Sequence, residues 1–274
     1  MNARHPGRSH AVPGAMIAVI NRWYNKNMFA RAVAQRRAGS DFHNYGYWDQ
    51  NTRTLKQACE NLMEKLLALI STKEGTILDV ACGKGATTRH LLNYYRAGDV
   101  TGINISERQL ARCRRNAPNC NFMLMDATAL GFPDRSFNNV ICVESAFHFN
   151  TRELFLRQAW RVLKPGGCLV LSDILNKSHD TYKNPLLPEA NYLKDSDAYR
   201  NLCLKTGFEE PQIVDATYEC WVRFYENSLR FHCNRFGRGE INRATFIRRV
   251  RALFQRGEQI SNYVLVRARR PDVS

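Results

Sequence analysis

The residues best suited to chemistry begin with a turn that follows an apolar run. The run starts at residue 76, ends around Asp79 and leads into a turn that contains Gly83 and Gly85. A helix-compatible segment, Ala86–Tyr95, follows. Glycine adopts positive φ without strain and lets a ligand approach the backbone closely. A strand, a glycine turn and a helix N-terminus in this order are typical of the first half of a nucleotide-binding α/β unit.

Two further groups of polar residues follow predicted strands, in the segments Glu144–Phe149 and Leu171–Ile174. His148 is the side chain best suited to accept a proton near neutral pH, because the unperturbed pKa of histidine is about 6.5. We expect Asp173 to fix the tautomer of His148 or to act as a base itself. Glu144 is the alternative base.

The elements that position these residues alternate regularly from residue 76 onward. Short apolar runs rich in β-forming residues predict strands at 76–82, 99–105, 121–127, 138–146, 167–175, 210–217 and 263–267. Helical patterns lie between them at 86–95, 107–116, 151–163 and 195–206. The alternation predicts an α/β fold with a doubly wound, mainly parallel, seven-stranded sheet that binds ligands at the carboxyl ends of its strands.

We interpret the chain as one integrated domain with four parts. These are an N-terminal helical cap or oligomerisation segment (1–70), an α/β core that binds a cofactor (71–217), a helical substrate lid (218–259), and a final strand with a tail (260–274). Within the cap we expect helices at Met16–Arg37 and Leu55–Ile70. The lid is predicted to be helical because the connection is too long for a loop.

The formal net charge of +15 is unevenly distributed. Residues 1–40 carry seven Lys and Arg and no acid, and residues 223–274 carry twelve against four, which leaves 21 of each sign in 41–222. Basic flanks of this kind attract an anionic substrate, nucleic acid or a membrane surface, or serve only as solvated surface.

Cysteine usage and hydropathy narrow the class of protein. The nine cysteines include no C-x-x-C pair and no Cys/His ligand spacing, which predicts reduced thiols in a cytoplasmic protein without a metal site. No apolar run approaches the roughly 18 residues that span a bilayer. The acid-free N-terminus is interpreted as a cap or dimerisation helix, with a transit peptide as the less favoured alternative.

Four blocks of sequence together resemble the class I S-adenosylmethionine-dependent methyltransferases, particularly the subgroup that methylates small natural-product molecules. The blocks are Asp79–Gly85, Val100–Ser106 with Gln109, Met125–Ala127 before Leu130–Asp134, and Ala159–Gly167. The resemblance covers residues 41–175 well and the rest only in layout. It implies a Rossmann-like fold, S-adenosyl-L-methionine as cofactor, and methyl transfer by in-line displacement. Because the sequence has no cluster of Cys, His and carboxylate at ligand spacing, we expect turnover without a metal.

The resemblance assigns cofactor contacts to named positions. The backbone around Ala81, Gly83 and Gly85 would approach the amino-acid end of the cofactor, with Asp79 orienting the turn or the ammonium group. Relatives often have an acid after the second strand that binds both ribose hydroxyls, but this chain has Asn104. An amide is a weaker acceptor than a carboxylate.

Three groups of side chains complete the implied cofactor site. Ser106 and Gln109 would share the ribose contact, and Asp126 with Ala127 would hold the adenine. The alternative for Asp126 is a turn former at the end of a strand.

The aromatic segment Asn44–Trp48 resembles the one with which relatives cover the cofactor. We expect Tyr45 and Tyr47 to contact the cofactor, since an aromatic face near a sulfonium is a cation–π partner. In natural-product relatives, a histidine at the position of His148 acts as the general base, and an aspartate at the position of Asp173 orients it. In relatives that methylate prenyl pyrophosphates, the glutamate at the position of Glu144 is implicated instead.

The favoured function is therefore methyl transfer to a small secondary-metabolite acceptor. The basic flanks are compatible with an anionic acceptor. The alternative is C-methylation of a prenyl pyrophosphate or another carbon nucleophile. A nucleic-acid methyltransferase is less favoured, because no Asn/Asp-Pro-Pro-aromatic segment follows the fourth strand. A nicotinamide-dependent enzyme would need a G-x-G-x-x-G motif, but its last glycine is replaced here by Thr88. A non-catalytic binding module would require a decayed cofactor site. The sequence does not separate O-, N- and C-methylation.

Overall fold

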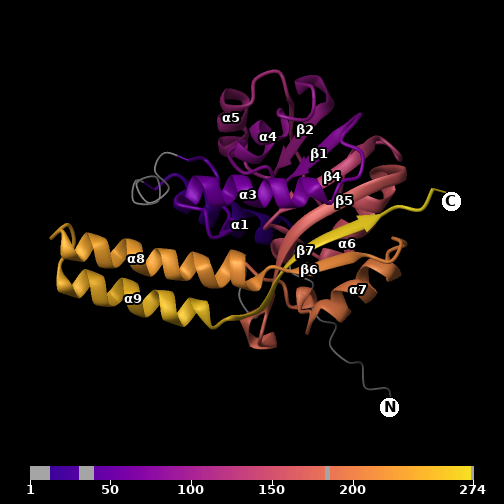
Figure 1. Ribbon diagram of the computed structural model, residues 1–274. Coiled ribbons are helices and arrows are strands. Elements are labelled where there is room, and N and C mark those ends of the chain that lie inside the picture. The colour runs from indigo at the N-terminus through magenta and orange to yellow at the C-terminus, as the bar shows by residue number, and fades with distance from the viewer. Residues whose placement is uncertain (1–12, 31–39, 183–185, 273–274) are drawn as a thin grey trace, which may run out of the picture.

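The computed structural model describes residues 13–30, 40–182 and 186–272. Helices cover both faces of one sheet, and a long helical hairpin extends away from it (Figure 1). The sheet has the strand order β3-β2-β1-β4-β5-β7-β6. Its strands are β1 (Ile77–Val80), β2 (Val100–Asn104), β3 (Asn121–Leu124), β4 (Phe137–Val143), β5 (Leu163–Asn176), β6 (Gln212–Asp215) and β7 (Ile260–Arg269).

The pairing confirms the predicted sheet. Strands β1 to β5 pair in parallel, whereas β7 is antiparallel to both β5 and β6. The order reverses between β1 and β4, which are neighbours in the sheet although β2 and β3 separate them along the chain. Open α/β sheets bind their ligands at such a reversal, outside the carboxyl ends of the two strands.

The two faces of the sheet carry separate apolar layers. The described α-helices are α1 (Pro13–Met28), α3 (Leu55–Ala68), α4 (Ala86–Leu91), α5 (Glu107–Asn116), α6 (Arg152–Val162), α7 (Ser196–Lys205), α8 (Arg223–Gly237) and α9 (Arg243–Gly257). Ile77 belongs to the same apolar cluster as Leu62 of α3, whereas its neighbour Leu78 belongs to the cluster that contains Phe155 of α6 and Tyr199 of α7. Successive strand residues point to opposite faces, so an uninterrupted apolar strand fills both layers.

Several predicted boundaries were wrong. Strand β5 begins at Leu163 instead of 167, because Gly166 takes φ +73° and the segment joins the sheet through an irregular register instead of forming a loop. The amide of Gly166 donates to the carbonyl of Arg270 (3.1 Å). Helix α4 ends at Leu91 instead of residue 95, since the chain tightens into turns there.

The N-terminal helix, predicted for Met16–Arg37, is α1 and ends at Met28. Residues 31–37 of that prediction lie outside the described residues. Helix α1 packs against the core of the same protein molecule. Its Asn21 Nδ2 donates to the carbonyl of Ile105 beyond β2 (3.0 Å). Assembly through this helix stays a prediction.

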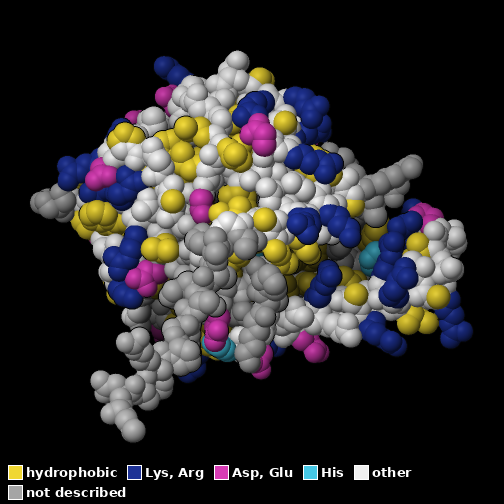
Figure 2. All heavy atoms as spheres, turned by 180° about the vertical axis from the view of Figure 1, so that it is seen from behind, with side chains coloured by type: hydrophobic (Ala, Val, Ile, Leu, Met, Phe, Trp, Pro, Cys, Tyr) yellow, Lys and Arg dark blue, Asp and Glu magenta, His cyan; other side chains and the backbone are white. Residues whose placement is uncertain are grey.

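Helices α8 and α9 confirm the helical prediction for 218–259. They run side by side and project from the sheet (Figure 1), after a π-helical turn at Thr217–Val222. At the base of the hairpin, Trp221 Nε1 donates to the carbonyl of Gly257 (2.9 Å) and Phe224 packs on Tyr45. Seen from behind in Figure 2, the hairpin forms the lobe at the right, which carries many basic side chains, all of them arginines. No described helix has the length and hydropathy needed to cross a bilayer.

Gly46 allows the N-terminal segment to lie against α3, which generates a stability prediction. Its φ is +77°, and a Cβ there would lie 2.6 Å from the Cβ of Ala58. We expect Gly46→Ala to lower the free energy of unfolding by about 2–4 kcal/mol, through overlap and left-handed strain together. Gly98→Ala is the control, because a Cβ there meets nothing within 4 Å. Equal effects of the two substitutions in urea denaturation would contradict this account.

Candidate active site

The turn after β1 has the conformation expected of a cofactor-binding turn. Ala81, Gly83 and Gly85 have φ of +58°, +57° and +81°. A Cβ on Gly85 would lie 2.8 Å from the Cα of Cys113, so this glycine permits close packing against α5. Among the described residues, a Cβ on Gly83 would meet just the Cε of Met28 within 4 Å, at 3.4 Å. Gly83 therefore faces a space closed by the flexible end of one side chain.

Asp79 orients this turn. Its carboxylate is buried, and Oδ2 accepts hydrogen bonds from the hydroxyls of Thr87 (2.7 Å) and Thr88 (2.6 Å). Burial raises the pKa of Asp79 to about 6. The carboxylate ties the end of β1 to the first turn of α4, which is one of the two roles predicted for it.

Asn104 joins the loops that follow β1 and β2. Its Oδ1 accepts from the backbone N–H of Ser106 (3.0 Å), and its Nδ2 donates to Gln109 Oε1 (3.1 Å) and to the carbonyl of Gly83 (3.4 Å). The Ser106 hydroxyl caps α5 by accepting from the N–H of Gln109 (3.3 Å). An aspartate at position 104 would have no donor for the Gly83 carbonyl. The departure from the family pattern thus has a structural role here.

Asp126 forms a turn at the end of β3. Its Oδ1 accepts from the backbone N–H (2.8 Å) and the hydroxyl (2.9 Å) of Thr128, and the neighbouring Ala127 is buried. The turn-forming role weighed for Asp126 is therefore present. Contact of Asp126 and Ala127 with adenine stays a prediction.

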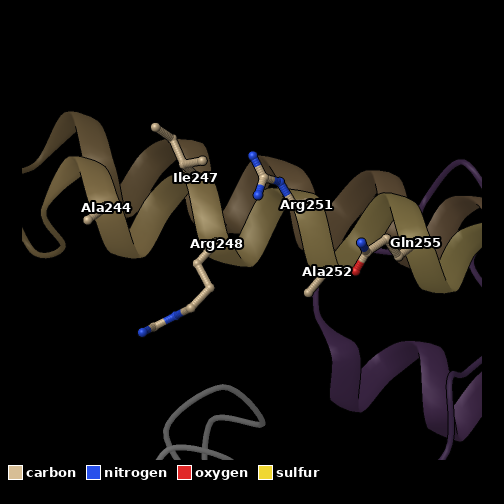
Figure 3. A pocket seen from close by; sticks show the side chains of 6 residues that line it. All are labelled: Ala244, Ile247, Arg248, Arg251, Ala252 and Gln255. Atoms are coloured by element: carbon tan, nitrogen blue, oxygen red, sulfur yellow. The ribbon is translucent and has the colours of Figure 1, made fainter.

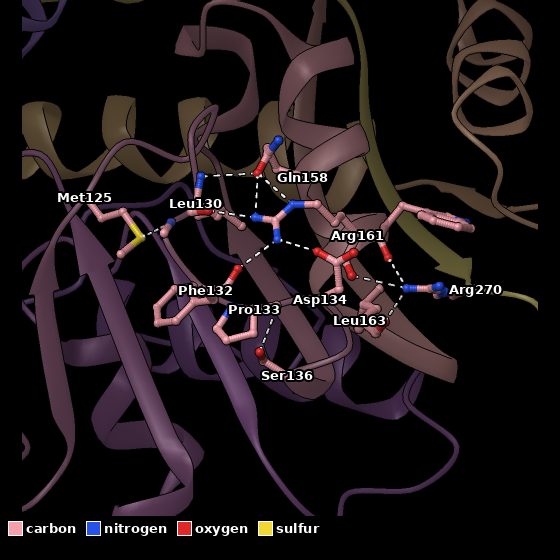
Figure 4. Close-up of polar contacts among 12 residues, drawn as sticks. Met125, Leu130, Phe132, Pro133, Asp134, Ser136, Gln158, Arg161, Leu163 and Arg270 are labelled. Atoms are coloured by element: carbon pink, nitrogen blue, oxygen red, sulfur yellow. Dashed lines mark hydrogen bonds and ion pairs between the residues drawn. The ribbon is translucent and has the colours of Figure 1, made fainter.

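Arg161 fixes the loop that follows Asp126. Its guanidinium donates to the carbonyls of Leu130 (2.6 Å) and Phe132 (2.7 Å) and to the carboxylate of Asp134 (2.7 Å), as Figure 4 shows. Arg161 comes from α6 and belongs to the fourth sequence block. That block therefore holds the third block in place.

His148 lies in a 3₁₀ turn just beyond β4. Its Nδ1 is 2.5 Å from the carbonyl oxygen of Leu186, and its Nε2 is 2.5 Å from the hydroxyl of Tyr24. A carbonyl can only accept, so Nδ1 carries the proton and Nε2 accepts from Tyr24. Burial lowers the pKa of His148 to about 4. The ring is therefore neutral near pH 7, with Nε2 available as a base.

Tyr24 is the functional candidate that sequence reasoning missed. It comes from α1, 124 residues before His148, and its ring also meets that of His43 edge to face. Burial and then the charge of Glu144 raise the pKa of Tyr24 above its ordinary value. The available signal was the row of polar residues Asn21, Tyr24 and Asn25 on one face of the predicted helix.

The same helix covers the predicted ribose-binding residues. Asn25 Oδ1 accepts from the Ser106 hydroxyl (2.8 Å) and from Gln109 Nε2 (3.3 Å). Asn25 Nδ2 in turn donates to Asn21 Oδ1 (2.8 Å). Helix α1 therefore contacts both the cofactor loops and the candidate base.

The hydrogen bond expected between Asp173 and His148 is not formed among the described residues. Asp173 is fully buried, and its Oδ2 accepts from Arg152 Nε (2.7 Å) and from the hydroxyl of Tyr199 (3.0 Å). Arg152 is also buried, at 1% exposure. A buried guanidinium needs a carboxylate partner, and Asp173 fills that need.

Asp173 nevertheless acts on the segment that carries His148. The backbone N–H of Arg152 donates to Asn191 Oδ1 (2.7 Å), and Asn191 Nδ2 donates to the carbonyls of Phe147 (3.1 Å) and Phe149 (2.6 Å). These carbonyls flank His148. Asp173 therefore positions the histidine indirectly, through Arg152 and Asn191.

Glu144 anchors the aromatic segment of the N-terminal part. Its φ is +49°, and its Oε1 accepts from the backbone N–H of Tyr45 (2.8 Å) and the hydroxyl of Tyr263 (2.6 Å). Burial and the Glu144 charge raise the pKa of Tyr263. This carboxylate oxygen is already engaged by two donors.

Tyr45 and Tyr47 point to different surroundings. The Tyr45 ring packs against Trp221 and Phe224, each with a centroid distance of 4.7 Å, so it joins the base of the hairpin to the core. Tyr47 lies under the ammonium of Lys65 on α3, 4.9 Å from the ring centroid. Their contact with a cofactor stays a prediction.

Comparison with known proteins identifies similar methyltransferases. Residues 77–167 match a family described as a methyltransferase domain. The chain is 38% identical over 146 residues to 27-O-demethylrifamycin SV methyltransferase of Amycolatopsis mediterranei, which covers 50% of this chain and 52% of that enzyme. It is 30% identical over 194 residues to methyltransferase GfsG of Streptomyces halstedii, covering 65% and 69%. The matched region thus spans about half of the rifamycin relative.

Solved structures share the fold. The [4+2]-cyclase SpnF has a TM-score of 0.71 at 21% identity, covering 93% of this chain and 97% of that one. Geranyl diphosphate C-methyltransferase from Streptomyces coelicolor A3(2) has a TM-score of 0.68 at 16% identity, covering 95% and 100%. At such identities the likeness establishes the fold alone. A cyclase and a methyltransferase share it, so the fold by itself does not define the reaction.

This chain belongs to the class I S-adenosylmethionine-dependent methyltransferases, of the natural-product type. S-adenosylmethionine is the cofactor of that family, and the residues here fit it. Gly83 leaves a space that any side chain would narrow, beside the buried polar groups of Asn104, Ser106 and Gln109. These residues would hold the amino-acid end and the ribose.

The open side of Gly83 gives a binding prediction. We expect Gly83→Val to weaken S-adenosylhomocysteine binding more than tenfold, about 1.4 kcal/mol, because its methyl groups enter the space kept by the glycine. Gly83→Ala carries the left-handed strain with less added volume, so it serves as the control and should bind more tightly than the valine variant. Titration calorimetry measures both. Unchanged affinity in Gly83→Val would refute the assignment.

The buried ion pair gives a stability prediction. Asp173→Asn leaves Arg152 buried without its countercharge, and we expect a loss of about 3–5 kcal/mol in the free energy of unfolding. Replacing Asp134, the exposed partner of Arg161, by asparagine is the control and should cost less than about 1 kcal/mol. Thermal or chemical denaturation distinguishes them. If Asp173→Asn is as stable as the wild type but slow in catalysis, Asp173 acts directly in the chemistry.

Proposed function

We propose that this protein transfers the methyl group of S-adenosylmethionine to a hydroxyl-bearing small molecule, with Tyr24 and His148 as the proton-accepting pair. The observation that carries the proposal is the 2.5 Å hydrogen bond between Tyr24 and the unprotonated Nε2 of a buried histidine beyond β4. Relatives support the acceptor class. The chain is 32% identical over 186 residues to O-methyltransferase cnsE of Penicillium expansum, covering 62% of this chain and 66% of that enzyme.

The site residues divide the task between positioning and proton transfer. S-adenosylmethionine, when bound, supplies a methyl group on a positively charged sulfur. The acceptor oxygen must lie in line with that methyl group, so much of the acceleration comes from holding it there. The aromatic side chains of Tyr45, Trp221, Phe224 and Tyr225 provide an apolar wall beside Glu144. We place the acceptor scaffold against this wall.

The proton leaves through two side chains. The acceptor hydroxyl gives its proton to the Tyr24 oxygen while Tyr24 passes its own proton to His148 Nε2. The acceptor oxygen keeps the electron pair that forms the new O–C bond, as the C–S bond breaks. Leu186 holds the other ring nitrogen as the donor, so the imidazole presents Nε2 throughout.

A carbon acceptor with Glu144 as base is the second candidate function. This candidate is supported by the sequence segment Glu144–Phe149 and by the basic flanks of the chain. The two hydrogen bonds to Glu144 Oε1 favour an anchoring role for this carboxylate. A hydroxyl acceptor is therefore preferred over a prenyl pyrophosphate, and a nucleic-acid acceptor ranks below both.

Substitution of the pair tests the mechanism. We expect His148→Ala to lower kcat by about 10²–10⁴-fold, the usual contribution of a positioned proton acceptor, while S-adenosylhomocysteine affinity stays nearly unchanged. Tyr24→Phe should lower kcat in the same direction, and the double variant should be little worse than His148→Ala, because residues that act as a unit are not additive. Tyr94→Phe is the matched control, since Tyr94 is exposed and bonds to Glu64.

Methyl transfer from labelled S-adenosylmethionine into a library of hydroxylated metabolites provides the assay, with products identified by mass spectrometry. If Glu144→Gln abolishes turnover while His148→Ala and Tyr24→Phe are mild, the base is Glu144. The carbon-acceptor function then replaces this one.

The pH profile gives an independent test. A base acts when neutral, so kcat should be constant above the pKa of His148 and fall as the pH drops through about 4, well below the ordinary histidine value. Tyr24 stays protonated across this range, because its pKa is raised. Circular dichroism at each pH separates loss of rate from unfolding. An acid limb near pH 6.5 would show that the imidazole is not buried during catalysis.

A further inference from the structure

The α8–α9 hairpin concentrates positive charge. Residues 223–257 contain nine arginines, no lysine and two glutamates. Glu240 pairs with Arg235 (2.8 Å) and lies 4.0 Å from Arg238. Helix α9 carries five arginines and no acid, and within the described residues no ion pair neutralises them. The charge of this helix is therefore available to a partner.

The outer face of α9 mixes these arginines with exposed apolar side chains. We define this face by Ala244, Ile247, Arg248, Arg251, Phe254 and Gln255, all of which are exposed. Ile247 is 44% and Phe254 62% exposed, although both are large and apolar. Figure 3 shows Ile247 and Arg251 projecting in one direction from the helix, whereas Arg248 extends in the other direction in this view. A hollow of about 480 Å³ lies against this face.

An apolar groove lies between the two helices. It has a volume of about 240 Å³ and is lined mainly by Trp221, Tyr225, Leu229, Leu253 and Phe254. Phe254 thus belongs to both the groove and the outer face. Tyr225 stacks near Tyr45, with ring centroids 6.4 Å apart, so the groove reaches the base of the hairpin beside the candidate active site.

We propose that the outer face of α9 docks on the surface of an anionic lipid bilayer. Arginines that alternate with exposed aliphatic and aromatic side chains are the composition of helices that lie in the headgroup region, where the cations meet phosphates and the apolar residues enter the acyl boundary. Nucleic acid would use the arginines but would leave Ile247 and Phe254 exposed to water. The apolar groove beside this face points to the same partner.

Co-sedimentation of the full chain with vesicles tests the proposal. We expect binding to phosphatidylcholine vesicles that contain phosphatidylglycerol, little binding to phosphatidylcholine alone, and weaker binding as salt shortens the Debye length. The double variant R248Q/R251Q should bind at least about tenfold less tightly, since each arginine near an anionic surface contributes about a fivefold factor. Ile247→Gln should also weaken binding without any change of charge.

The control variant R114Q/R115Q removes the same charge from exposed positions on α5, outside the hairpin. It should retain vesicle binding, and circular dichroism should show all variants folded. Equal losses in R114Q/R115Q and R248Q/R251Q would overturn the proposal, because attraction would then follow net charge alone. Wild-type protein that binds single-stranded or duplex RNA but not anionic vesicles would overturn it as well. Unchanged binding of Ile247→Gln would remove the apolar part of the argument and with it the bilayer as partner.

Discussion

A buried ion pair between Arg152 and Asp173 sets the geometry around the candidate base. Two charges without access to water must be compensated locally, and here Asp173 also accepts from Tyr199 while Arg152 also donates to the carbonyl of Ile174. Arg152 begins α6, Asp173 lies on β5, and Asn191 carries the connection to the carbonyls on either side of His148. The histidine is consequently held by backbone that a sheet strand and a helix N-terminus fix together. This arrangement allows a short turn at the carboxyl end of the central strand β4 to present a ring nitrogen in one direction.

The features that could be predicted from the sequence are those that depend on patterns of neighbouring residues. Alternation of apolar strands and amphipathic helices is encoded in neighbouring residues, so the sheet, its mainly parallel order and the turn after β1 are predicted correctly. Partners far apart in the chain are not encoded in this way. Nothing near Asp173 indicates that Arg152 takes its carboxylate, and nothing near His148 points to Tyr24. Burial decides both pairings, and burial depends on the packed fold.

Backbone strain marks both sides of the reversal between β1 and β4. Ala81 and Glu144 take positive φ although neither is glycine, and they follow the two strands that meet there. Such conformations cost of order 1–3 kcal/mol each and persist where the surrounding structure enforces them, commonly at ligand sites. Asn104 helps to hold the strained turn in place, since its amide donates a hydrogen bond to the carbonyl of Gly83. The asparagine is thus part of the support of the turn and does not indicate decay of the site.

Helix α1 carries Tyr24 and Asn25 as consecutive residues, and these contact the base and the loop after β2 respectively. Consecutive residues on a helix are separated by a fixed rotation of about 100° and a rise of 1.5 Å, so a rigid-body shift of the helix moves both contacts together. Helix α1 thereby links the position of the candidate base to that of the loop after β2. A shift that breaks the contact of Asn25 with Ser106 would therefore also move Tyr24 away from His148, and the return of the helix would restore both contacts. A fusion or deletion that alters the seating of this one helix would therefore change the loop after β2 and the surroundings of the candidate base together.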